Sequence, residues 1–415
     1  MTNHDRRLGE LGVLLLDAGM SVTDVRDNLV AVRNTHPAEK DIEFAVLPIA
    51  VWVTDRDTGH TTFVQSAGKE LSFRQAAHAS RLVQQTVAAD VALAQVPERI
   101  AAIRRMPRTR PVASWVMGSA LVAGGLAVVF RCPWWSIVVA FIVGGLVGLT
   151  TSILGRTRNG DAVAPFVAAF GATALVGATA SIFDFDSVPL YGVCAPIAIL
   201  VPGALITNAL LELTAADIVT GASRLMYGLM MLGFMSVGIL AGGAVTGLHI
   251  DHDSAMLVGE IPGLAGNGGW QGLPPFPLSW IGVVALAVGV GLAFGAGTRL
   301  IVLSVVMMTL TFSVVSAVTV LVGNVVATGF AAAVLFVAAR ILERMTVAVP
   351  ATVSFQPAFL LMVPGTVGLV ALASMDAGSV GMIFQTFVSL CLGTKIGALI
   401  AETLFVVKHP SADHM

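Results

Sequence analysis

The chain has 415 residues, of which 56% are hydrophobic and only 12% are charged, and its mean hydropathy is +0.86. A soluble domain carries about a quarter charged residues, so most of this chain is expected to face lipid or other protein instead of water. The net charge of -2 gives no basic footprint and excludes nucleic acid as an expected partner.

The charges are concentrated in the first quarter of the chain. Residues 1–111 hold 14 of the 23 Lys and Arg residues and 13 of the 25 Asp and Glu residues. This asymmetry predicts a soluble domain over 1–111, including a basic linker, followed by a membrane domain. The first residues lack the short apolar segment and cleavage site of a signal peptide, so we expect the domain to stay in the cytoplasm.

Two helices are predicted at the start of this domain. Leucines at helical spacing run from Leu8 to the break at Ala18-Gly19. Ser21 can then cap a second helix that ends near Asn34, with Asp24 completing an acidic variant of the capping box.

A β-hairpin and a long helix are predicted next. Residues 42–53 are rich in β-branched and aromatic types and predict one strand, and residues 61–65 predict its return strand. Pro48 fits an edge or a bulge of such a strand. Residues 71–95 predict a single long helix, which makes the whole a small α/β domain.

Ten segments of the remaining chain are apolar and long enough to span a bilayer as helices. They cover residues 112–130, 134–154, 163–182, 189–212, 220–246, 278–296, 299–318, 320–340, 352–374 and 379–405. With both termini in the cytoplasm, seven Lys or Arg residues near the helix ends lie inside and only Arg131 lies outside, as the positive-inside rule favours.

Residues 112–250 and 278–415 are expected to be two homologous membrane halves, separated by an external loop at 251–277. Val201-Pro202-Gly203 and Val363-Pro364-Gly365 each lie in the fourth of five spans. Because five is odd, the second half enters the membrane upside down. We therefore predict an all-α polytopic membrane domain of about ten helices in two inverted five-helix repeats, an arrangement typical of secondary transporters.

The paired Pro-Gly sequences point to a substrate site between these halves. Proline leaves carbonyl groups without a donor and glycine lets the backbone bend. The freed carbonyls suit an ammonium group, and the amides that open the next half-helix suit a carboxylate. A plain kink in a packed helix is the alternative. The predicted substrate-binding residues are Pro202, Gly203, Thr207, Asn208, Pro364, Gly365 and Lys395.

Charged residues within spans are costly and become functional candidates. Glu212 and Glu402 are the candidates for proton coupling, and Glu402 shares a helix face with Lys395. The alternatives are that Glu212 reaches the inner interface and that Lys395 extends to the membrane surface.

No metal site or cofactor is predicted. Cys132, Cys194 and Cys391 are far apart, so they form neither a disulfide framework nor a zinc motif. His249, Asp251, His252 and Asp253 in the external loop match no strong ligand spacing. Glycines four residues apart inside spans indicate close helix packing, which we assign to packing within the chain over a homo-oligomer interface.

Several features occur in a fixed order: LGELGVLLLDAGMSVTDVRDNL at 8–29, FAVLPIAVWVT at 44–54, an Arg-rich segment before ten spans, and the Val-Pro-Gly pair. In these features the whole chain resembles the bacterial threonine/serine exporter family. The resemblance implies a multi-pass protein of the bacterial inner membrane that exports threonine and serine, driven by the proton gradient. It supports Pro202, Gly203, Pro364 and Gly365 as site residues.

Three other functions remain as alternatives. Split relatives of the family imply dicarboxylate export as one of them. A membrane-embedded enzyme is disfavoured, because the chain has neither His-Glu-x-x-His nor Gly-x-Ser-x-Gly. A sensor or scaffold that acts through the N-terminal domain is the last.

Overall fold

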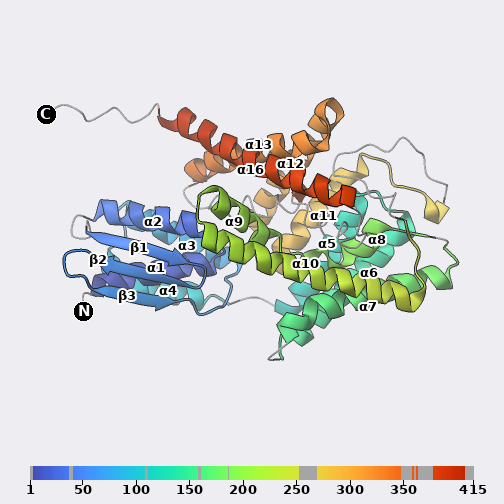
Figure 1. Ribbon diagram of the computed structural model, residues 1–415, viewed down its shortest axis with the longest axis horizontal. Helices are drawn as coiled ribbons and strands as arrows, with labels where there is room; N and C mark the ends of the chain where they lie inside the picture. The colour runs from blue at the N-terminus through green and yellow to red at the C-terminus, as the bar shows by residue number, and fades with distance from the viewer. Residues whose placement is uncertain are drawn as a thin grey trace.

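The computed structural model describes residues 3–36, 41–107, 111–157, 160–185, 187–251, 269–346, 358, 361–362 and 377–406. Buried apolar side chains form two separate cores, one within residues 8–103 and the other within residues 122–390. Figure 1 shows the N-terminal strands and helices gathered at one end of the molecule, and the long helices of the second core at the other.

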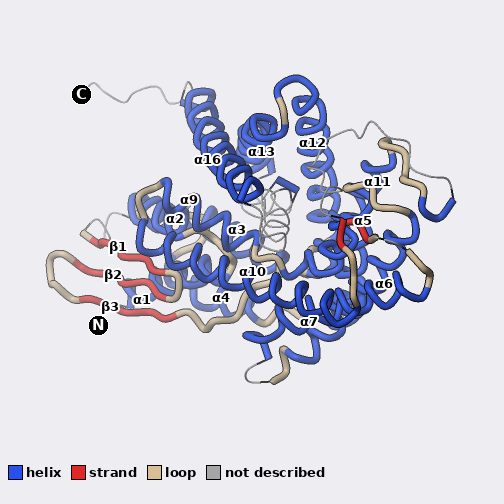
Figure 2. The backbone as a smooth tube through the Cα atoms, turned by 45° about the vertical axis from the view of Figure 1, so that its right-hand side comes forward, coloured by secondary structure: helices blue, strands red, loops and turns tan. Residues whose placement is uncertain are grey.

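The first core lies between a three-stranded antiparallel sheet and the helices that pack on it. The strands are β1 (Ile42–Leu47), β2 (Ala50–Asp55) and β3 (Thr61–Gln65), in the order β1-β2-β3. Figure 2 shows them side by side at the opposite end of the molecule from α11 and α12. The helices are α1 (Asn3–Asp17), α2 (Val22–Thr35), α3 (Phe73–Val87), the short 3-10 helix Leu93–Gln95 and α4 (Val96–Arg104).

The predicted cap of the second helix is present. Ser21 is the N-cap of α2, and its hydroxyl accepts a hydrogen bond from the Asp24 amide at 3.1 Å. The hydroxyl also donates to the Asp24 carboxylate at 2.7 Å. The start of α2 is therefore fixed by its own sequence.

Two predictions for this region were wrong. The run 42–53 is not one strand, because Pro48 and Ile49 form a tight turn that places Leu47 opposite Ala50 and makes three strands instead of two. The helix predicted over 71–95 ends at Val87, and Ala89 adopts a left-handed conformation with φ 59°. Neither glycine nor proline marks that stop.

The second core is built from long apolar helices. These are α5 (Pro111–Val129), α6 (Trp134–Leu154), α7 (Gly160–Ile182), α10 (Ile218–Thr246), α11 (Leu278–Ala293), α12 (Thr298–Val322), α13 (Asn324–Thr346) and α16 (Ala377–Val406). A broken segment between α7 and α10 consists of α8 (Leu190–Cys194), the 3-10 helix Ala195–Leu200 and α9 (Gly203–Thr214).

Among the described residues, six helices are long and apolar enough to cross a membrane, and a seventh span results if the broken segment counts as one. Residues 278–293 and 385–401 form shorter apolar helices. The chain is thus a mostly helical, multi-pass membrane protein. The predicted span at 352–374 lies outside the described residues apart from three positions, so the total of ten stays a prediction.

Helices α5 and α11 cross at contacts between backbones. A Cβ atom at Gly118 would lie 2.7 Å from the carbonyl oxygen of Gly289, and one at Gly125 would lie 2.7 Å from that of Gly282. The reverse contacts hold at 2.8 Å in both cases. Only glycine permits two helices to approach this closely, so these four positions determine how α5 and α11 pack.

We predict that Gly125→Ala destabilises the protein by about 1–3 kcal/mol, because the added methyl group meets a rigid carbonyl. Gly233→Ala in α10 is the control, since a Cβ there meets nothing within 4 Å. The control is expected to match or exceed the wild type, because alanine is the better helix former. The unfolding midpoints of both variants are measured in the same detergent. Equal midpoints would contradict the close contact between α5 and α11 at Gly125.

Candidate functional site

The segment before α9 is interrupted at the predicted position. The 3-10 helix ends at Leu200, Val201 is extended, and α9 begins at Gly203 with its axis bent by 75°. The residues around the break are enclosed by α5, α6 and α7, and Ile197 and Ala198 are fully buried. An irregular backbone at this depth in the bundle is tolerated only where protein or a cavity surrounds it.

The other predicted site residues do not all gather at this break. Thr207 on α9 is buried, and its hydroxyl has no hydrogen-bond partner among the described residues. Asn208 instead points to the N-terminal domain, where its side-chain amide donates to the Gly19 carbonyl at 2.8 Å. Lys395 is exposed on α16. Pro364 and Gly365 lie outside the described residues, as does the side chain of Glu402.

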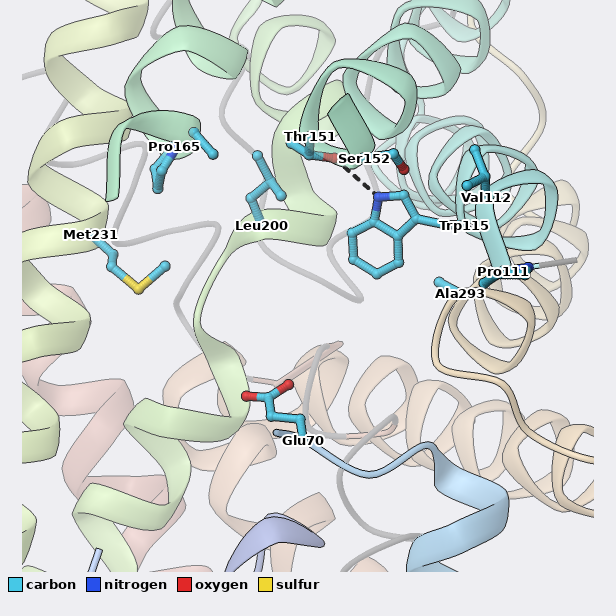
Figure 3. A pocket seen from close by; sticks show the side chains of 11 residues that line it. Glu70, Pro111, Val112, Trp115, Thr151, Ser152, Pro165, Leu200, Met231 and Ala293 are labelled. Carbon is cyan, nitrogen blue, oxygen red and sulfur yellow. Dashed lines mark hydrogen bonds between the residues drawn. The ribbon is translucent and has the colours of Figure 1, made fainter. Parts of the chain in front are cut away.

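A cavity of about 540 Å³ lies beside the break. Leu200 lines it directly before Val201, and α5, α6, α7, α10 and α11 form the rest of its wall together with one residue of the N-terminal domain. Figure 3 shows that residue, Glu70, on the far side of the cavity from Trp115 and Leu200. The lining residues are Glu70, Pro111, Val112, Trp115, Thr151, Ser152, Ala164, Pro165, Leu200, Met231 and Ala293.

Aromatic contacts connect the wall of this cavity to the N-terminal domain. The Trp115 indole donates to the Thr151 hydroxyl at 3.0 Å and meets the Phe294 ring edge-on at 5.8 Å. Phe294 stacks on Phe73 of α3 at 5.2 Å, and the Phe73 amide donates to the Phe294 carbonyl at 2.9 Å. The domain is therefore part of the wall and is held in place there.

A second contact holds the start of α2 against α9 and α10. Glu212 on α9 is fully buried, and its carboxylate accepts hydrogen bonds from the Val22 amide at 2.8 Å and from Arg224 of α10 at 2.5 Å. Val22 is the first residue of α2. The partial positive charge of a helix N-terminus and a guanidinium together stabilise this buried carboxylate.

Asp217, in the turn between α9 and α10, extends the same interface. Its carboxylate accepts from the Thr23 hydroxyl at 2.6 Å and from both terminal nitrogens of Arg26 at 3.0 and 3.1 Å. Burial raises the pKa of Asp217, but these hydrogen bonds and the Arg26 charge outweigh it and leave the pKa below the ordinary 3.8. This contribution to docking is therefore present above the ordinary pKa and is lost as the pH falls through the lowered one.

Asp24, in the first turn of α2, lies near positive charges of α13 and α16. Burial raises the pKa of Asp24, while the Ser21 hydrogen bond and the positive charges of Arg340 and Lys395 oppose the shift. Lys395 is thus close enough to act on the domain electrostatically.

Comparison with protein-family models identifies a family for the sequence that forms these elements. The model of the ThrE family, described as a putative threonine/serine exporter, matches residues 6–246, which include the domain, the broken segment and α10. The chain belongs to this family. No curated protein and no solved structure matches the chain. The family match covers every residue of the interface between α2 and the α9–α10 turn, and all lining residues of the cavity except Ala293.

In this member of the exporter family, the sequence alone did not reveal parts of the cavity wall and of the docking interface. Glu70 and Trp115 carry no local motif, and Asp217 reads as an ordinary loop residue. One signal was available for Glu212, since Arg224 follows twelve residues later across a short turn. The docking partner of this pair, Val22, lies 190 residues away from Glu212 and could not be inferred.

We predict that Glu212→Ala weakens docking of the domain, because it leaves the Arg224 side chain, only 11% exposed, without its counter-ion. Removing one partner of a buried ion pair costs about 3–5 kcal/mol. Amide hydrogen exchange in the first turn of α2 should rise and the unfolding midpoint should fall.

The control is Glu10→Ala, which breaks an ion pair with Arg6 whose side chains are 28% and 68% exposed. Such a surface pair contributes at most about 0.5 kcal/mol, so exchange at α2 should stay as in the wild type. Unchanged exchange in the Glu212 variant would show that the pair does not hold the domain.

Proposed function

We propose that the protein is a secondary exporter of small amino acids, threonine and serine, coupled to protons. The observation that carries the proposal is the cavity beside the interrupted helix, in a chain of the threonine/serine exporter family. Broken helices beside cavities within the membrane domain are where secondary transporters bind solute and ions.

The N-terminal domain is proposed to lie in the cytoplasm, which makes the cavity open inward. Arg156 follows α6 just beyond the cavity residue Ser152, Arg224 binds Glu212 at the docked domain, and Arg299 lies in the first turn of α12, shortly after Phe294. Arg131 lies at the other end of the bundle, where it donates to the Pro274 carbonyl. This distribution supports an inward-facing exporter with the domain inside.

The reciprocal contacts of α5 with α11 support the proposal of two inverted halves. Gly118 and Gly125 are spaced as Gly282 and Gly289 are, and the first of each pair contacts the second of the other. A two-fold axis produces this pattern between equivalent helices. The pairing of α7 with α10 recurs as that of α13 with α16, the third and fifth spans of each half.

The proposed solute site combines the break with its neighbours. Pro202, Gly203 and Thr207 would meet the zwitterion from the first half, where the Thr207 hydroxyl has no described partner. Pro364 and Gly365 would do so from the second half. Asn208 and Lys395 would contribute from the domain interface, and Glu212 and Glu402 are proposed to carry the coupled proton.

Two alternatives are less well supported. A dicarboxylate exporter needs cationic groups along the path, whereas Glu70 gives the described cavity wall a negative charge and no lining residue there is positive. A sensor acting through its N-terminal domain does not require that domain to form part of a cavity wall.

Transport in proteoliposomes tests the function directly. Vesicles that contain the protein and are loaded with threonine or serine should release the amino acid faster than equally loaded vesicles without the protein. An inward proton gradient should accelerate this release. Succinate-loaded vesicles serve as the comparison. Release of succinate alone would replace the proposal with dicarboxylate export, and no release of any of the three solutes would remove it.

The coupling residues have a separate test. Glu212→Gln keeps a side-chain oxygen for the Val22 amide but cannot exchange a proton, so we expect transport to persist with a flattened dependence on external pH. Glu402→Gln is measured beside it, and Glu98→Gln on the exposed face of α4 is the control. A wild-type pH profile in both coupling variants would exclude the two carboxylates.

A further inference from the structure

The cavity has one charged residue in its wall, and that residue does not belong to the membrane domain. Among its described lining residues only Glu70 is ionisable, and the others are apolar or carry a hydroxyl group. Glu70 lies in the segment that joins β3 to α3, within the N-terminal domain. It faces Trp115 and Leu200 across the cavity (Figure 3).

The backbone that carries Glu70 is fixed at three consecutive amides. The Leu71 amide donates to the Asp17 carbonyl, the Ser72 amide to the Gln75 side chain and the Phe73 amide to the Phe294 carbonyl, each at 2.9 Å. The first two bonds attach the segment to the domain, and the third attaches it to the end of α11. The backbone that follows Glu70 is thus held at the cavity on both sides, while the Glu70 side chain is exposed there.

The anchor on the domain side is itself held in place. The Asp17 carboxylate is 3% exposed and accepts from Arg104 at 2.6 Å and from the Ser66 hydroxyl. Arg104 is the last residue of α4, shortly before α5 enters the membrane domain. The position of Glu70 is therefore tied to the start of α5, the helix that also carries Trp115.

The Thr151 hydroxyl opposite Glu70 offers little for an anionic solute. The Thr151 hydroxyl already accepts from Trp115 and donates to the backbone of α6. Glu70 is exposed at the cavity, where its carboxylate attracts cations. The chemical group that suits it is a primary ammonium, which can donate charge-assisted hydrogen bonds to both oxygens.

We propose that Glu70 binds the ammonium group of the exported solute at the inner mouth, so that the N-terminal domain supplies part of the substrate site. This inference rests on the proposed export of amino acids. It assigns the first recognition step to the junction of the domain and the bundle, before the solute reaches Pro202 and Gly203. Solutes with a carboxylate but no ammonium group are repelled at this point.

The test compares Glu70→Gln, Glu70→Asp and the wild-type full-length protein, with Glu98→Gln as the matched control. Glu98 is exposed on the same domain and does not line the cavity. Two measurements are made: export of threonine from proteoliposomes, and equilibrium binding of threonine to the purified protein. Competition by 2,3-dihydroxybutanoate, which carries a hydroxyl group in place of the ammonium group, is measured in both.

Loss of one charged hydrogen bond predicts that Glu70→Gln raises the KM and the Kd for threonine about tenfold or more, with kcat little changed. Competition by 2,3-dihydroxybutanoate should strengthen, because the repulsion is gone. Glu70→Asp should lie between Glu70→Gln and the wild type, and Glu98→Gln should match the wild type.

The outcomes separate the two proposals. Threonine export by the wild type with an unchanged KM in Glu70→Gln overturns the role of Glu70 alone. Threonine binding that weakens in Glu70→Gln, without export by the wild type, supports the binding site and overturns the exporter. Equal losses for threonine and 2,3-dihydroxybutanoate would also overturn the role of Glu70, because they would indicate general damage to the cavity.

Discussion

The burial of Glu212 constrains the whole arrangement. A carboxylate that has left water needs compensating charge, and here it obtains it from Arg224 within the membrane domain and from the first amide of α2 in the N-terminal domain. Arg224 is close to Glu212 in sequence, whereas the Val22 amide comes from a residue 190 positions away. The domain must dock for the end of α9 to be stable, and docking brings the segment before α3 over the cavity. Helix α9 therefore connects the break at Pro202 to the N-terminal domain, because it begins directly after the break and carries Glu212 near its other end.

Local chemistry made part of this structure predictable. The Ser21 cap was readable as a pattern, and Pro202-Gly203 marked the interruption that the structure contains. The helix at 134–154 has the predicted bounds. These features succeed because each depends on residues that are close in sequence.

The remaining features depend on contacts that no short window contains. The strand over 42–53 divides because a turn at Pro48 and Ile49 lets β2 pair with both neighbours, and the propensity of the run cannot reveal that. The helix after Ser72 stops where nothing in the local sequence requires it. Glu70 is an ordinary surface glutamate by sequence, and long-range bonds such as that from the Phe73 amide to Phe294 place its segment at the cavity.

The distance along the chain between Val22 and Glu212 also sets an order of events during synthesis. Helix α2 leaves the ribosome 190 residues before its partner, and the first core is complete within residues 8–103. Domains made first fold first, so the N-terminal domain is already folded, with the Val22 amide hydrated, while the four apolar segments before the α9–α10 turn enter the bilayer. Attachment to the α9–α10 turn is therefore a late step in biogenesis. In a nascent chain that stops before Glu212, the domain is folded but the carboxylate that its Val22 amide binds is missing.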